Sequence, residues 1–166
     1  MFSNPDLLWK AQHPHARFGQ GAFRLALEVC YKARLQSLGL GEQEIEDRLG
    51  DFVQYGKPVV SQMRHTKQAL VAQEQELGCK ISKHYVIGDN PHSDIQGARN
   101  VDKIAEEKLD TRWSGILVRT GVYKDGDDTA GADVVCDDVL GAVKHVFQEH
   151  KNELKLKNKK REVSLM

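Results

Sequence analysis

Cysteine is scarce in this chain, and its three copies, Cys30, Cys79 and Cys136, are far apart with no Cys-x-x-Cys pair. Neither a disulfide framework nor a zinc site is therefore indicated, and a reducing compartment is the simplest interpretation. No apolar stretch approaches the roughly 20 residues that span a bilayer. Residues 1–6 lack the charged and apolar regions of a signal peptide. We expect no membrane partner, and the sequence assigns no compartment.

An excess of charge is also missing, because 24 Lys and Arg balance 24 Asp and Glu. A formal net charge of zero argues against wholesale nucleic-acid binding, so we expect no such partner. The balance hides a basic end: residues 151–166 hold six basic and two acidic residues, which leaves residues 1–150 at −4. So short a basic segment is most often a solvated end. We predict a frayed helix extension or a mobile tail over 151–166.

What is present fits one ordinary soluble domain of 166 residues, 40% hydrophobic and 29% charged. Apolar residues at three-four spacing predict a helix over about 20–38 that stops near Gly39. A second helix, about 59–77, is predicted to have Pro58 in its first turn and to end at Gly78. Shorter elements are predicted at 42–49, a helical turn, and at 52–55, a brief strand.

Three short apolar runs rich in β-branched residues, 85–87, 116–118 and 134–136, are typical of strands that are covered on both faces. Helical segments follow two of them, at about 92–108 and 138–150. Strands that alternate with helices indicate an α/β fold with a doubly wound parallel sheet. Ligands of such folds sit at the carboxyl ends of the strands.

An acidic turn follows the first of these strands. Asp89 comes directly after Gly88, Asn90 can cap the next helix, and Asp94 falls in its first turn. Two carboxylates this close can hold Mg²⁺, which prefers carboxylate oxygen, water and often a substrate phosphate. A helix cap with a dipole-complementing first-turn acid explains the same residues about equally well.

Lys57 lies in a second turn, Tyr55-Gly56-Lys57-Pro58, just before the predicted helix over 59–77. Alone, such a lysine is more often a solvated surface residue. With an acidic turn at a comparable strand end, we favour a functional interpretation, in which the ammonium faces a transferred phosphoryl group.

Other patterns are weaker. Gly19-Gln20-Gly21 lacks the third glycine and the preceding strand of a dinucleotide loop. No apolar strand leads into Asp125-Gly126-Asp127-Asp128-Thr129, so we predict a turn-rich loop there. Among the histidines only His92, beside the acidic turn, is of interest, and even there a surface position at the start of a helix is the favoured interpretation.

Taken together, these segments resemble the haloacid dehalogenase (HAD) superfamily, in the order and spacing of its class IIA members. The resemblance is strongest to the subgroup that includes cat eye syndrome critical region protein 5. It covers nearly the whole chain except the basic tail. The segments that carry it are Ser3-Asn4-Pro5-Asp6, Gly19-Gln20-Gly21, Tyr55-Gly56-Lys57-Pro58, Gly88-Asp89-Asn90-Pro91-His92-Ser93-Asp94-Ile95 and Ile116-Leu117-Val118-Arg119-Thr120-Gly121-Val122, with Phe2 to Trp9 and Arg17 to Phe23 adding to the match.

The resemblance implies a Rossmann-like core with an inserted cap domain. Residues 1–50 would be the closing part of the cap, 51–150 the second half of the core, and 151–166 a basic tail. Lys57 would hold the phosphate and the nucleophile, Asp89 would help to bind Mg²⁺, and Asp94 would orient the metal shell or Lys57. The implied substrate is a phosphorylated small molecule, with Asn4, Asp6 and Asn90 as substrate-binding residues. Relatives have been placed in mitochondria.

The family's reaction also needs an aspartate nucleophile on the first core strand, and no such Asp-x-Asp-Gly strand occurs in these 166 residues. Positioning groups cannot replace the missing covalent step. We therefore expect a C-terminal portion of a phosphatase-type hydrolase that is inactive alone and marginally stable, because its half-sheet exposes apolar surface. The missing N-terminal half or a second copy would be its partner. The alternative is a non-catalytic binding or interaction module.

Overall fold

A computed structural model describes residues 1–50, 52–102 and 112–164. Its centre is a three-stranded parallel sheet in the order β3-β4-β5. The strands are β3 (Lys83–Gly88), β4 (Arg112–Val118) and β5 (Val134–Cys136), as the three apolar runs predicted. The α/β fold class is therefore confirmed.

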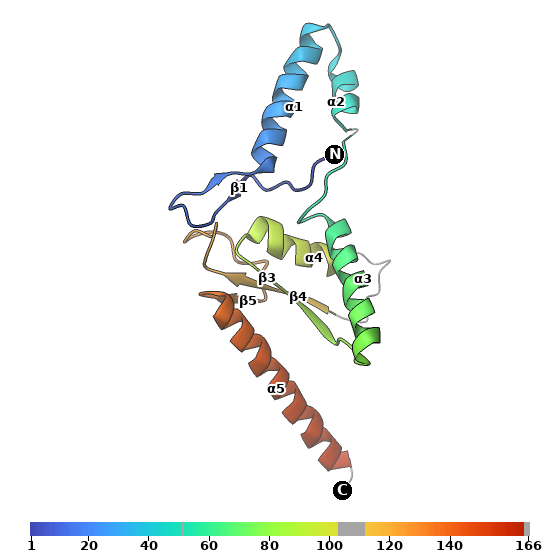
Figure 1. The fold of residues 1–166 in the computed structure, drawn as a ribbon, viewed down its shortest axis with the longest axis vertical. Coiled ribbons are helices and arrows are strands. Elements are labelled where there is room, and N and C mark those ends of the chain that lie inside the picture. Colours follow the sequence, from blue (N-terminus) through green and yellow to red (C-terminus); the bar gives the residue numbers. More distant parts are fainter. Residues whose placement is uncertain (51, 103–111, 165–166) are drawn as a thin grey trace.

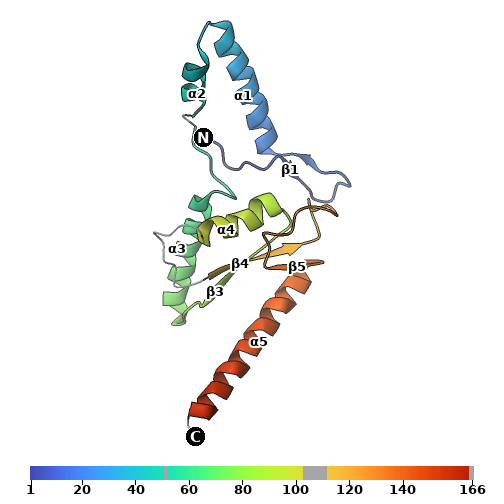
Figure 2. The ribbon, with the colours of Figure 1, turned by 180° about the vertical axis from the view of Figure 1, so that it is seen from behind.

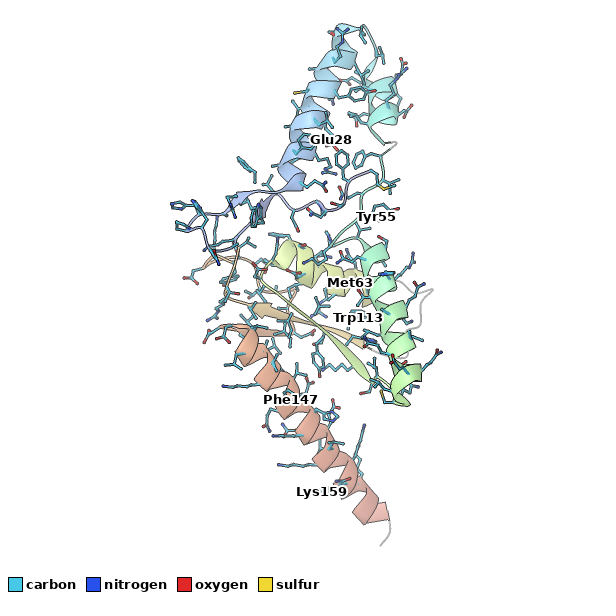
Figure 3. The ribbon with its side chains drawn as sticks, viewed as in Figure 1. Glu28, Tyr55, Met63, Trp113, Phe147 and Lys159 are labelled. Carbon is cyan, nitrogen blue, oxygen red and sulfur yellow. The ribbon has the colours of Figure 1, made fainter. Side chains whose placement is uncertain are left out.

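Helices cover both faces of this sheet. Figures 1 and 2 show α3 (Val60–Leu77) and α4 (Gln96–Asp102) on one face and the start of α5 (Val139–Ser164) on the other. Two core clusters match these layers. The first joins Met63 of α3 to Val101 and Trp113, and Figure 3 shows Met63 and Trp113 side by side. The second joins Ile116 and Val118 to Ala142 of α5.

The alternation of side chains along each strand accounts for this division. On β4, Trp113 packs in the first cluster, whereas Ile116 and Val118 pack in the second. On β3, Val86 lies against the first cluster, and Tyr85 and Ile87 lie against the second. Strands with apolar side chains on both faces are the pattern that a parallel sheet covered on both sides requires.

The N-terminal third of the chain extends away from the sheet (Figure 1). It contains the antiparallel pair β1 (Leu8–Trp9) and β2 (Arg17–Phe18), then α1 (Gln20–Ser37) and α2 (Glu42–Gly50). Both helices agree with the predicted segments. The two short strands β1 and β2 were not predicted, because each is only two residues long.

Two predicted elements near Lys57 are wrong. Residues 52–55 do not form a strand: Gln54 makes a single isolated bridge to Phe2, and the Phe52 ring packs edge-on against the Phe2 ring at 5.6 Å between centroids. Pro58 does not lie in the first turn of α3, which begins at Val60. Pro58 instead belongs to a turn closed by a hydrogen bond from the Val59 amide to the Gly56 carbonyl.

Two further helices differ from their predicted bounds. The helix expected over 92–108 begins with a π-type turn, η1 (Pro91–Ile95), and continues as α4 to Asp102; residues 103–108 lie outside the described part of the chain. The helix expected over 138–150 continues to Ser164, so the structure has the helix extension and not the mobile tail. Beyond the sheet this helix points into solvent (Figure 2).

Large apolar side chains are exposed on both projecting helices, among them Phe23 of α1 and Phe147 of α5. Figure 3 shows Phe147 on the part of α5 beyond the sheet. Strand β3 has one neighbour, β4, among the described strands. The instability expected from this surface remains a prediction. None of the helices in the described ranges is long and apolar enough to cross a membrane.

Candidate functional site

The acidic turn lies at the carboxyl end of β3. Gly88 ends that strand, and Asp89 leads into Asn90, whose side-chain oxygen accepts a hydrogen bond from the His92 amide at 3.0 Å. Asn90 is therefore a helix cap, as the capping alternative required. The cap places the buried Asp94 one turn further along, over the end of the strand.

Lys57 and Asp94 meet at this point. The Lys57 ammonium donates a hydrogen bond to Asp94 Oδ1 across 37 residues of sequence, while Asp94 Oδ2 accepts one from the Asn90 amide at 3.2 Å. The Asp94 side chain is 7% exposed and the Lys57 side chain 33%. Capping alone requires neither the burial of Asp94 nor its pairing with a lysine from another turn.

Asp89 is held from the neighbouring strand. Its Oδ2 accepts a hydrogen bond from the Val122 amide at 2.6 Å, in the turn that follows β4. No described residue contacts its second oxygen within hydrogen-bonding distance, so Oδ1 can accept a ligand. The carboxyl ends of β3 and β4 thus share the carboxylate, which places it at the edge where ligands of α/β sheets sit.

Two glycines make room for these carboxylates. A Cβ on Gly88 would lie 2.1 Å from Asp94 Cγ, and one on Gly121, at φ +61°, would lie 1.8 Å from Asp89 Oδ2. A side chain at either position would displace an acid. Neither glycine was predicted to have a role. Gly88 directly follows the apolar run 85–87, whereas Gly121 lies three residues beyond the run 116–118.

A pocket of about 360 Å³ opens beside this corner. Pro5 to Leu8, the acidic turn and the loop after β4 line it, and Figures 1 and 2 both show that loop beside the β1 hairpin. Of the predicted substrate-binding residues, Asp6 and Asn90 line the pocket. Asn4 lies outside it, where a Cβ on Gly56 would come within 2.7 Å of its Cα, and its Oδ1 accepts a hydrogen bond from the Asp6 amide.

The loop after β4 contributes Val122, Lys124 and Asp127 to the pocket, and none of these residues was predicted to belong to a site. The segment with Asp125 forms a loop, as predicted, yet Asp127 within it faces the pocket. Its Oδ2 accepts a hydrogen bond from the Lys124 amide at 2.9 Å. His92 is exposed and lines the same pocket.

The carboxylates of Asp89 and Asp94 meet some, but not all, of the requirements of a site for a hard cation. Within the described ranges, no group of three or more His, Cys, Asp and Glu side chains comes together to hold a metal ion. Mg²⁺, however, is commonly bound by one or two carboxylates with water and substrate phosphate. Asp89, with one oxygen available, and Asp94, in the first turn of the helix that follows it, fit that smaller requirement.

The structure thus shows an α/β domain in which a lysine and two aspartates lie at the carboxyl edge of a parallel sheet. A family model described as HAD-hydrolase-like matches residues 54–142, more than half of the chain. The chain belongs to the HAD-like hydrolase family. The matched range contains Lys57, Asp89 and Asp94.

Curated relatives agree. The chain is 32% identical over 165 residues to a cardiolipin synthase (CMP-forming) / mitochondrial hydrolase fusion protein of Schizosaccharomyces pombe, covering 98% of this chain and 24% of that protein. It is 30% identical over 171 residues to a mitochondrial hydrolase of Saccharomyces cerevisiae, covering 90% of this chain and 43% of that protein. The chain therefore spans less than half the length of either relative.

Among solved structures, a p-nitrophenyl phosphatase from Archaeoglobus fulgidus is similar, with a TM-score of 0.47 and 19% identity. The match covers 86% of this chain and 44% of that structure.

Proposed function

We propose that this chain supplies one half of the active site of a Mg²⁺-dependent, phosphatase-type hydrolase. The observation that supports this most directly is the ion pair between Lys57 and the buried Asp94, beside Asp89. A helix cap alone requires neither the burial of Asp94 nor its pairing with Lys57. A phosphate site needs a fixed cation and carboxylates for a metal at one strand edge, and the corner has both.

In this proposal each residue has a defined task. Asp94 positions the Lys57 ammonium, which neutralises charge on a phosphoryl oxygen. Asp89 and Asp94 would hold Mg²⁺, which supplies Lewis-acid stabilisation of the phosphoryl group. Asp6 and Asn90 contact the organic part of the substrate. Asn4 holds Asp6 in place, because its Oδ1 accepts a hydrogen bond from the Asp6 backbone amide.

The aspartate nucleophile of the family's reaction does not occur in these 166 residues as an Asp-x-Asp-Gly strand. We therefore propose that the chain alone is inactive, because no aspartyl-phosphate can form on it. From the names of the two curated relatives we also propose a mitochondrial location. Imaging of a fluorescent fusion of the natural protein checks that location.

Calorimetric titration with Mg²⁺ tests the metal corner. We expect binding to the wild-type chain that Asp89→Asn abolishes, whereas Asp125→Asn, an exposed acid in the loop after β4, leaves it unchanged. Equal binding by all three proteins would contradict the assignment. No binding at all would favour a non-catalytic interaction module.

A second experiment tests the reaction. Phosphatase activity is measured on a version of the protein extended upstream with an Asp-x-Asp-Gly strand. We expect activity that Asp89→Asn removes, and equal activity in both proteins would rule the assignment out.

A further inference from the structure

The pocket beside the phosphate corner has a mixed lining whose chemistry restricts its ligand. It adjoins the corner directly, because Asn90 and Val122 line it while their amides bind Asp94 and Asp89. Pro58, the next residue after Lys57, also lines it. A phosphate held by Lys57 would therefore have its organic part in this pocket.

One part of the lining is apolar. Leu7 and Leu8 of the N-terminal segment line the pocket together with Val122, and prolines complete the apolar lining at positions 5, 58 and 91. Such a surface packs against carbon-bound hydrogens and offers them no hydrogen bonds.

The other part is polar and carries both signs of charge. Asp6 and Asp127 are carboxylates, and Lys124 is a cation. With His92 neutral, these groups give the lining a formal charge of −1. Asp127 is fixed by the Lys124 amide, and the Asp6 backbone is fixed because its carbonyl accepts a hydrogen bond from the Gly21 amide at 2.9 Å.

This arrangement disfavours a second anionic group on the ligand, because two carboxylates face it and one lysine cannot balance both. An ammonium group would suit the carboxylates but would oppose Lys124. A hydroxyl group suits both, since it donates to a carboxylate and accepts from an ammonium.

We infer that this pocket binds the uncharged, hydroxylated body of a phosphomonoester, such as a sugar or polyol monophosphate, with Asp6 and Asp127 as its hydroxyl acceptors. The inference rests on the proposed function, because the phosphate is assigned to the Lys57 corner. A volume of about 360 Å³ has room for a single sugar ring and its phosphate.

Binding of two matched probes in the presence of Mg²⁺ tests the inference. Sorbitol 6-phosphate and 6-phosphogluconate are both open chains with the same phosphate and carbon number, and they differ only in carrying a hydroxymethyl group or a carboxylate at C1. We expect the wild-type chain to bind sorbitol 6-phosphate about tenfold more tightly, a difference of about 1.4 kcal/mol. n-Hexyl phosphate, which lacks hydroxyl groups, should also bind about tenfold more weakly than sorbitol 6-phosphate.

Variants assign the preference to residues. Asp6→Asn combined with Asp127→Asn should reduce the discrimination against 6-phosphogluconate to about twofold, while Asp125→Asn, outside the pocket lining in the same loop, should keep it. Asparagine retains an oxygen acceptor for the Lys124 amide, so the loop is preserved, and circular dichroism confirms that each variant is folded. Unchanged discrimination in the double variant would overturn the inference.

The remaining outcomes separate the two proposals. Equal affinity for all three probes, sensitive to Asp89→Asn, would overturn the inference and leave the proposed function intact. No binding of any probe or of inorganic phosphate would overturn both.

Discussion

The ion pair between Lys57 and Asp94 gives the sharpest stability prediction. Replacing Lys57 by methionine leaves the Asp94 carboxylate, 7% exposed, with the Asn90 amide as its remaining donor among the described residues. Removing one partner of a fully buried pair costs about 3–5 kcal/mol. Because the Lys57 side chain is 33% exposed, solvent screens part of the interaction, and we expect Lys57→Met to cost about 1–3 kcal/mol.

A double-mutant cycle measures the pair itself. Urea unfolding of the wild type, Lys57→Met, Asp94→Asn and the double variant should give a coupling free energy of about 1–2 kcal/mol. Asp94→Asn alone should cost less than Lys57→Met, because the freed ammonium can reach solvent. The same cycle on Glu44 and Arg48, an exposed pair at 3.1 Å, should give about 0.3–0.5 kcal/mol. A coupling no larger than this control would refute the argument that the Lys57 pair is shielded.

Three further predictions concern Gly121 at the corner, the ion pair of Glu149, and the exposed apolar surface. Gly121→Ala should abolish Mg²⁺ binding measured by calorimetry, because the new Cβ would displace Asp89. Gly126→Ala is the control and should retain binding: Gly126, at φ +96°, shares the backbone strain but has open space around it. The hydrogen bond from Lys83 holds the pKa of Glu149 below its ordinary value of 4.5, so its stabilisation is present at neutral pH and is lost as pH falls below about that value. Glu149→Gln should therefore lower the melting temperature at pH 7 but much less at pH 3; an equal loss at both would contradict this. The exposed apolar side chains of α1 and α5 should bind an apolar-surface dye, and a monomer that melts cooperatively without binding dye would count against instability.

The central fold was predictable because its signals are local. Runs of β-branched residues gave all three sheet strands, and three-four spacing gave α1 and α3 to within one residue. The elements that failed depend on partners. Residues 52–55 have strand-like composition but make one bridge, to Phe2. Pro58 suits the first turn of a helix as well as it suits the turn it occupies, so composition could not decide between them.

The candidate site was predictable to a similar degree. The order of Lys57, Asp89 and Asp94 along the chain indicated one strand edge, and the structure brings Lys57 and Asp94 into contact. The pocket was only partly predictable. Lys124 and Asp127 reach it because the loop after β4 folds back toward the N-terminal segment, and no periodicity in the sequence encodes that return.

Asn90 and Asp94 show how a cap and a site share the same residues. The Asn90 side chain caps the helix, and its amide holds Asp94, so the capping geometry fixes the carboxylate that binds Lys57. Burying an ion pair is weak support for stability, since apolar residues of similar volume often stabilise a protein as well or better. The half-buried Lys57 and the buried Asp94 are therefore not explained by the free energy of unfolding alone, which agrees with the phosphate corner proposed above. The cap supplies the rigidity that such a corner needs.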